Sequence, residues 1–256
     1  MINWVDDDTP LPPTHLAMGA DDEAPGLLAA GGRVTVRRLE EAYRHGVFPW
    51  FSLGQPTLWW SPNPRMVLPT AEFRISPSLK KTLRRFLRTP GCEIRIDSAF
   101  ERVIGACSST PRAGQRGTWI LPGMISAYVQ WHQAGRVHSV ETWIDGELVG
   151  GLYGVGMGRM FFGESMFAHR TDASKIALAA LVAMCRARGV PLIDCQQNTA
   201  HLATFGAREI TREAFEAHLA LTLSAPSVDK AVDEWTYDSG MWRHLNLALP
   251  PTDTHA

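Results

Sequence analysis

The sequence lacks the features that mark metal-bound, disulfide-linked and membrane-spanning proteins. Its 256 residues include only four cysteines, none of them in a C-x-x-C pair or beside a pair of histidines. Zinc sites and disulfide frameworks depend on such spacing, so we expect neither. No apolar run approaches about 18 residues, the shortest length that suggests a membrane-spanning helix.

An excess of charge of one sign is also missing. The formal net charge is −1, so a nucleic-acid site would have to be a local basic patch. Asp6, Asp7 and Asp8 stand where a secretory signal peptide would be basic. With 45% hydrophobic and 20% charged residues, the composition is that of a globular protein, and we expect it in the cytoplasm.

Periodicity and turn residues predict an α+β fold. From residue 92 onward the predicted order is a strand, two helices, a three-stranded meander, a helix, a strand and a last helix. These elements are expected at 92–97, 99–107, 122–135, 137–144, 148–155, 159–167, 172–188, 191–195 and 211–223. The Asp145-Gly146 pair between two apolar runs is a strong hairpin signal. A meander followed by a helix and a further strand favours α+β over a doubly wound sheet.

The N-terminal part of the chain predicts a separate small domain. Residues 1–34 are rich in Pro, Gly and Asp and predict little regular structure. Thr35 can cap a short helix that Gly46 closes. We place the small domain at 1–64 and a larger domain at 65–256.

A basic helix is predicted just after this boundary. Ser76 suits the N-cap and Pro77 the first helical position, and Leu79, Leu83 and Phe86 form an apolar stripe. Five cations share another face without an acidic neighbour: Lys80, Lys81, Arg84, Arg85 and Arg88. Such a face is usually solvated. Because the like charges repel one another, binding to phosphates is the alternative that would explain them.

A glycine-rich stretch at 150–158 does not have the spacing of a phosphate loop. Its glycines lie inside and between predicted strands, and no lysine follows as in a Walker motif. We interpret it as a strand and turn that another segment or a ligand approaches closely.

Glu164 stands among apolar and aromatic residues in FGESMF, residues 162–167. A carboxylate in a dry site needs a partner, because an isolated buried charge is very costly. Two interpretations stay open: a structural ion pair with an arginine, or a carboxylate that awaits a cationic group of a substrate.

A second set of polar side chains stands at the end of the apolar strand LIDCQ, residues 192–196. Side chains alternate along a strand, which predicts that Asp194 and Gln196 share one face and Cys195 the other. Such a pair can orient a nucleophile and a carbonyl, or it can satisfy loop backbone groups. A cysteine protease built on Cys195 would need a histidine, for which only His169 and His201 are near in sequence.

Two tryptophans are candidates for contact with a ligand. Trp50 lies in an aromatic cluster, and Trp119 follows a loop rich in Ser, Gly and Arg. Either side chain could stack on a base or pack into the core.

Eight segments, in this order, resemble the bacterial leucyl/phenylalanyl-tRNA–protein transferases, over about residues 26–215. They are GVFPWF (46–51), WWSPNPR (59–65), GTWI (117–120), HSVETW (138–143), ELVGGLYG (147–154), FGESMF (162–167), ASK (173–175) and LIDCQ (192–196). The resemblance implies a small N-terminal domain joined to a C-terminal domain similar to the GCN5-related N-acetyltransferase fold. Gly151 stands where an acetyl-CoA loop would carry Gln or Arg, so that cofactor is not expected.

The resemblance implies transfer of Leu or Phe from aminoacyl-tRNA to proteins that begin with Arg or Lys, which marks them for degradation. No metal or other cofactor is needed, and a monomer is the simplest expectation. Two alternatives stay open: another tRNA-dependent aminoacyltransferase, of the peptidoglycan type, and a non-catalytic RNA-binding module.

Site residues follow by resemblance at the matched positions. Glu164, Asp194 and Gln196 would form the reaction centre, while Trp50 and Trp119 hold the 3′ end of the tRNA. The basic helix would contact the acceptor stem. An apolar pocket for the Leu or Phe side chain would be lined by Leu152, Phe161, Met166, Leu178, Leu181 and Ile193. Some family members carry Met in place of Leu152 and Phe in place of Leu181. The resemblance does not extend to the tail after Leu223, with Trp235 and Trp242, for which we can place no counterpart.

Overall fold

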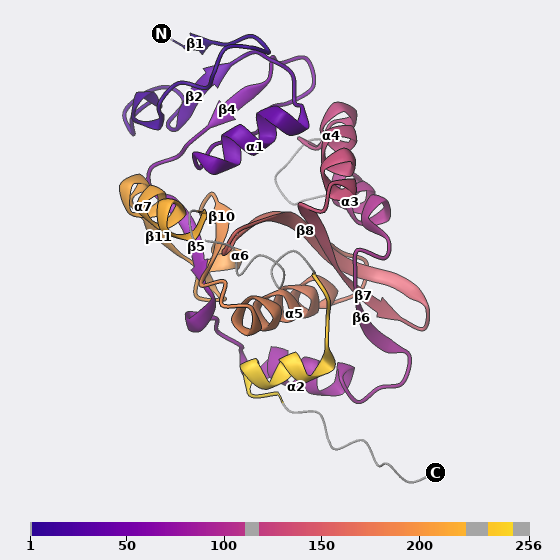
Figure 1. Ribbon diagram of the computed structural model, residues 1–256. Helices are drawn as coiled ribbons and strands as arrows, with labels where there is room; N and C mark the ends of the chain where they lie inside the picture. The colour runs from indigo at the N-terminus through magenta and orange to yellow at the C-terminus, as the bar shows by residue number, and fades with distance from the viewer. Residues whose placement is uncertain (1, 111–117, 224–234, 248–256) are drawn as a thin grey trace.

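The computed structural model, described for residues 2–110, 118–223 and 235–247, contains two β-sheets with helices packed around them (Figure 1). The mixed arrangement confirms the predicted α+β class. Within the described residues, no helix has the length and hydropathy that a membrane span requires.

The smaller sheet is built from the first 60 residues, in the strand order β1-β2-β4-β3. Its strands are β1 (Asn3–Trp4), β2 (Leu27–Ala30), β3 (Phe48–Pro49) and β4 (Leu58–Trp60). Only β1 and β2 run parallel. Regular structure before Thr35 consists of β1, β2 and the 3-10 helix η1 (Thr14–Leu16), which agrees with the expectation of little regular structure there. These elements span two to four residues, too few for a periodic pattern to show.

The larger sheet has seven strands in the order β11-β5-β10-β9-β8-β7-β6. The strands are β5 (Arg65–Pro69), β6 (Cys92–Ile96), β7 (Val137–Ile144), β8 (Glu147–Met157), β9 (Met160–Ala168), β10 (Leu192–Gln196) and β11 (Arg208–Ile210). β9 and β10 are parallel, and the other neighbours are antiparallel. The β7–β8 hairpin turns at Asp145-Gly146, as predicted.

Helices cover both faces of the larger sheet (Figure 1). The helices are α1 (Val36–Arg44), α2 (Pro77–Phe86), α3 (Phe100–Ser109), α4 (Pro122–Gln133), α5 (Ala173–Ala187), α6 (Ala200–Ala203) and α7 (Arg212–Leu223), with the 3-10 helices η2 (Thr70–Glu72) and η3 (Ser239–Leu245). Phe162 packs with the α3 and α4 side, whereas Phe161 packs with the α5 side. Consecutive residues of β9 thus reach opposite cores, as strand alternation requires.

Local sequence signals account for the starts of α1 and α2. The Thr35 hydroxyl accepts the Arg38 N–H at 3.2 Å, and the Ser76 hydroxyl accepts the Leu79 N–H at 3.2 Å. Both are N-caps of the predicted kind, and Pro77 occupies the first turn of α2.

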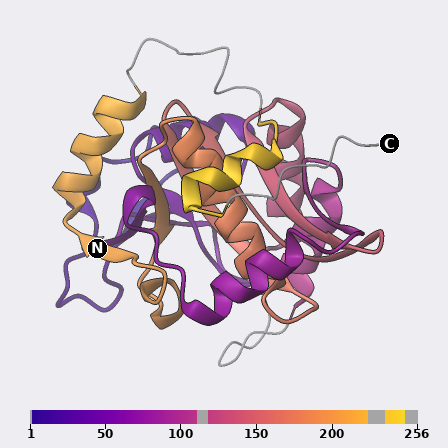
Figure 2. The same ribbon diagram turned by 90° about the horizontal axis from the view of Figure 1, so that it is seen from below.

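The C-terminal segment 235–247 lies outside α5. Seen from below, η3 crosses α5 on the side away from the sheet (Figure 2). Trp242 is fully buried there, and Arg186 of α5 donates to the His244 carbonyl oxygen at 2.6 Å.

The break between the two sheets falls between β4 and β5. We therefore keep the predicted division into residues 1–64 and 65–256 as a proposal. The two parts do not have separate cores: Leu28 and Leu39 belong to the same buried cluster as Val103 and Phe162.

Candidate active site

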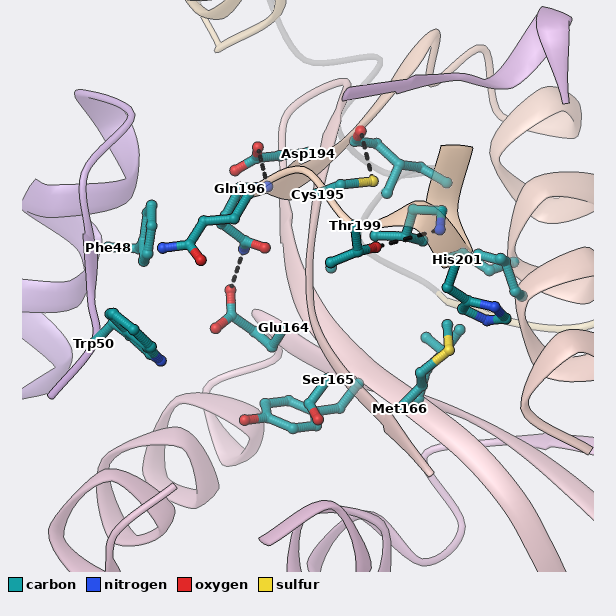
Figure 3. Close-up of a pocket in the computed structure, with 18 of the residues that line it drawn as sticks. Phe48, Trp50, Glu164, Ser165, Met166, Asp194, Cys195, Gln196, Thr199 and His201 are labelled. Atoms are coloured by element: carbon teal, nitrogen blue, oxygen red, sulfur yellow. Dashed lines mark hydrogen bonds between the residues drawn. The ribbon is translucent and has the colours of Figure 1, made fainter. Parts of the chain in front are cut away.

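A cavity of about 530 Å³ opens where the smaller sheet meets the middle of β9 and the carboxyl end of β10 (Figure 3). Its walls come from β3, β8, β9, α5, β10 and α6. One end carries Trp50, Glu164 and Gln196, while Met166 and His201 lie toward the other.

Glu164 is the centre of a hydrogen-bond network at the polar end. Its carboxylate accepts the hydroxyl of Tyr43 at 2.6 Å, the hydroxyl of Tyr128 at 3.1 Å and the side-chain amide of Gln196 at 3.1 Å. The two tyrosine oxygens are 2.7 Å apart. Of the two interpretations drawn from the sequence, the arginine ion pair is absent among the described residues, where the donors are neutral.

Burial perturbs the ionisation of this group. Removal from water raises the pKa of Glu164 to about 7, because the charged form is disfavoured, although the two tyrosine hydroxyls oppose the shift. Burial and the nearby carboxylate raise the pKa of Tyr43 and of Tyr128 well above the usual value. The tyrosines therefore stay neutral donors, and Glu164 can change its charge near neutral pH.

Asp194 is buried and paired with a buried arginine. Nε of Arg65 lies 2.8 Å from Oδ1 of Asp194, and its NH2 nitrogen lies 2.6 Å from Oδ2. Arg65 also donates to the Gly46 carbonyl oxygen at 2.9 Å. Its guanidinium carbon lies 4.8 Å from the centroid of Phe48 and 4.7 Å from that of Phe215. This bidentate pair fixes Asp194 in one orientation.

The alternation predicted along β10 ends at Gln196. The pairing with β5 shifts between Asp194 and Gln196, and Gln196 has a φ of 55°. Oδ1 of Asp194 accepts the backbone N–H of Gln196 at 3.0 Å, which supports this left-handed conformation. The bulge lets the Gln196 side chain reach Glu164 while the Asp194 side chain faces Arg65.

The apolar part of the cavity contains five of the six predicted pocket residues. They are Leu152, Met166, Leu178, Leu181 and Ile193. Phe161 is the exception, and its place in the lining has to be corrected. It lies behind the lining, with its ring 5.0 Å from that of Trp235, because its side chain turns over Gly154.

Both predicted tryptophans border the cavity. Trp50 is 36% exposed and meets Trp60 edge to face, with ring centroids 5.6 Å apart. Trp119 is half-buried. An exposed ring face at a cavity mouth is available for stacking.

Four of the five predicted cations lie on the outer side of α2, and Arg88 follows its end because the helix stops at Phe86. Lys80 is half-buried, and Lys81, Arg84, Arg85 and Arg88 are exposed. Across the described ranges, none of the five takes part in an ion pair. α2 is linked to the start of α5 through Thr82, whose hydroxyl donates to Asp172 at 3.3 Å.

Sequence comparison identifies the family. The model described as "Leucyl/phenylalanyl-tRNA protein transferase" matches residues 67–220, and that of its N-terminal domain matches residues 32–63. The chain belongs to this family. Relatives named leucyl/phenylalanyl-tRNA–protein transferase include one from Methylibium petroleiphilum, 60% identical over 98% of this chain and 94% of its own. Another, from Leptothrix cholodnii, is 62% identical over 96% of this chain and 95% of its own.

A solved structure of a GCN5-related N-acetyltransferase from Kribbella flavida is also similar to this member of the leucyl/phenylalanyl-tRNA protein transferase family. It is 9% identical and covers 67% of this chain and 60% of its own, with a TM-score of 0.34. At that TM-score the likeness carries no argument about mechanism.

Sequence reasoning missed three residues of the polar end in this family member. Tyr43 and Tyr128 stand in none of the eight segments, and Arg65 is only the last residue of WWSPNPR. The available signal was Glu164 itself, because a carboxylate among apolar residues requires buried donors, and inward-facing tyrosines are the usual neutral ones. No cluster of side chains suited to a metal ion occurs among the described residues.

Proposed function

We propose that this protein transfers Leu or Phe from aminoacyl-tRNA to the N-terminal α-amine of proteins that begin with Arg or Lys. The observation that carries the proposal is the form of the cavity. An apolar end suited to a Leu or Phe side chain adjoins a polar end with Glu164 and Gln196. An aminoacyl ester needs both, since its side chain is apolar and its reacting atoms are polar.

The reaction is the aminolysis of an ester. The nitrogen of the acceptor amine attacks the ester carbonyl carbon, an amide bond forms, and the bond to the ribose oxygen breaks. The proton lost by the amine ends on that ribose oxygen. The ester is already activated, so the transfer itself consumes no ATP and requires no metal or other cofactor. The protein has to align the reactants and stabilise the developing oxyanion.

In this proposal Gln196 and Glu164 act at the reacting atoms. The Gln196 amide nitrogen donates to Glu164, which leaves the amide oxygen as an acceptor for the attacking amine. Glu164, held by two tyrosine hydroxyls, binds the amino group of the aminoacyl ester. Because hydrogen bonds already orient the Glu164 carboxylate and the Gln196 amide, these side chains need to move little as the reaction proceeds.

Asp194 acts in this proposal through Gln196 rather than as a base. Both of its oxygens are already bonded to Arg65, and it accepts the Gln196 backbone N–H. The bidentate pair with Arg65 holds the carboxylate in the core, turned toward the guanidinium. Its contribution is to keep Gln196 in its left-handed conformation.

The remaining candidate residues would bind the donor. Trp50 and Trp119 would stack on the 3′ end of the tRNA, since both border the cavity. The cations of α2 would contact phosphates of the acceptor stem, where their charge would be neutralised. We further propose that the protein acts as a monomer and in the cytoplasm, where charged tRNA is found.

The test is a transfer assay with wild-type protein, radiolabelled Leu-tRNA or Phe-tRNA, and peptides that differ only in an N-terminal Arg, Lys or Met. Labelling of the Arg and Lys peptides, and not of the Met peptide, is the expected result. Binding of charged tRNA without transfer would point to an RNA-binding module. Labelling of a cell-wall precursor in place of the peptides would point to an aminoacyltransferase of the peptidoglycan type.

A further inference from the structure

Trp235 occupies a place that the sheet leaves empty. A Cβ atom on Gly156 of β8 would lie 2.9 Å from the indole nitrogen of Trp235, so no other residue fits beneath this ring. The indole is 6% exposed although the residue lies outside every helix and strand. The C-terminal segment thus supplies the side chain that β8 lacks at this point.

The same face of β8 continues from Trp235 to the cavity. A Cβ atom on Gly154 would lie 2.5 Å from the ring of Phe161, so that ring covers Gly154 as the indole covers Gly156. The next residue on this face, Leu152, lines the cavity. Three side chains therefore follow one another along β8: the Trp235 indole, the Phe161 ring and Leu152. All three belong to one buried cluster.

Strand pairing connects Phe161 to a second wall of the cavity. Phe161 is the register partner of Gly156 on one side and of Ile193 on the other. Ile193 also lines the cavity. Phe161 is thus placed between Trp235 and two lining residues, Leu152 and Ile193, and cannot shift toward Gly156 while the indole is present.

The segment that carries Trp235 is held firmly. The guanidinium of Arg188 donates to the Thr236 carbonyl oxygen at 2.6 Å, and its carbon lies 5.5 Å from the Trp235 ring centroid. The imidazole of His138 stacks on the indole, with ring centroids 5.1 Å apart and an angle of 25° between the ring planes. Because these contacts fix the indole, it can hold the neighbouring Phe161 ring in place.

We propose that Trp235 is a specificity-determining residue, which holds Phe161 against the back of the apolar cavity and so sets the room available to the donor side chain. This inference rests on the proposed function. It assigns the C-terminal segment a role in the choice of donor. Removing the indole lets Phe161 retreat over Gly156, which enlarges the space behind Leu152 and Ile193 and favours the larger Phe side chain over Leu.

The experiment compares Leu-tRNA with Phe-tRNA as donors for wild type, Trp235→Ala and Trp235→Phe. For Trp235→Ala we expect the Phe-to-Leu ratio of kcat/KM to rise by roughly tenfold, the lower end of the effect of one methylene of space in a hydrophobic pocket. Trp235→Phe should restore most of the wild-type ratio. The KM for the acceptor peptide should stay within about twofold of wild type, because the amine binds at the other end of the cavity.

Trp242→Ala is the matched control. Trp242 belongs to the same segment and is fully buried, and its indole donates to the Tyr237 hydroxyl. We expect this variant to lower Tm but to keep the wild-type ratio. Combining Trp235→Ala with Phe161→Leu should shift the ratio by less than the product of the single shifts, because both act through one ring.

An unchanged ratio in folded Trp235→Ala overturns the inference, and so does an equal shift in Trp242→Ala. If Trp235→Ala does not fold, Trp235→Leu decides: a shift of the ratio toward Phe supports the inference, and an unchanged ratio overturns it. If wild-type protein transfers neither amino acid, the proposed function fails and this inference with it. If wild type transfers the amino acids but the variants keep its ratio, only the inference about Trp235 is refuted and the proposed function stands.

Discussion

Replacing Arg65 with methionine should destabilise the protein by about 3–5 kcal/mol, because the change leaves the Asp194 carboxylate buried without its partner. Arg65 is 1% exposed and Asp194 0%, so water cannot replace the lost contacts. The variant loses the two bonds to Asp194, at 2.8 and 2.6 Å, and the 2.9 Å bond to the Gly46 carbonyl. It also loses a guanidinium held between the rings of Phe48 and Phe215.

Two companion variants separate the causes of this loss. Arg65→Lys keeps a positive charge but lacks the planar guanidinium that bonds both carboxylate oxygens. It should therefore lower the free energy of unfolding by roughly half as much as Arg65→Met does. Asp194→Asn added to Arg65→Met removes the unpaired charge and should recover at least about 1 kcal/mol. Urea unfolding followed by tryptophan fluorescence measures the free energies from the midpoint and slope. A loss below about 1 kcal/mol for Arg65→Met, or no recovery in the double variant, would refute the reasoning.

Two further predictions concern charge. The pKa of Glu164 is raised from its ordinary 4.5 to about 7, so the folded state binds a proton more tightly than the unfolded state does. The free energy of unfolding should therefore fall as pH rises from about 4.5 to about 7. Glu164→Gln should flatten this part of the profile in urea unfolding, and an unaltered slope would contradict the assignment. On α2, the double variant Arg84→Ala, Arg85→Ala removes two cations that would contact phosphates. The plot of the logarithm of the tRNA association constant against the logarithm of salt concentration should become less steep by about two. The control pair Arg37→Ala with Arg44→Ala, on α1, should leave that slope unchanged.

The sequence predicted most of the main sheet and its longer helices because these elements are strongly patterned, but it did not predict β11 or α6, which span three and four residues. The hairpin at Asp145-Gly146 and the caps at Thr35 and Ser76 depend on neighbouring residues alone, so the structure confirms them. The strands β1 to β4 were not predicted. They span two to four residues and are defined by pairing partners far away in the chain.

The polar end of the cavity shows the same limit. The sequence pointed to Glu164 because a carboxylate among aromatics is chemically conspicuous. Its donors, Tyr43 and Tyr128, lie on two helices, 121 and 36 residues away, and only the fold brings them together. The bulge at Gln196 could not be predicted either. Its left-handed conformation depends on Asp194, which Arg65 holds in place across the sheet.

The tail after Leu223 gave no signal from the sequence. Trp235 acquires its place from Gly156 and Phe161, which precede it by more than 70 residues. A glycine inside a strand did predict a close approach by another segment. Which segment approaches is decided by the path of the chain beyond α7, which local patterns do not encode.

The central claim is that transfer takes place at the Glu164–Gln196 end of the cavity. The most direct test is single-turnover transfer from a preformed complex with Leu-tRNA to an Arg-initiated peptide. We predict that Gln196→Ala slows this step by on the order of 10²-fold while Asn198→Ala, an exposed neighbour, keeps the wild-type rate. Transfer by Gln196→Ala at the rate of Asn198→Ala would contradict the account.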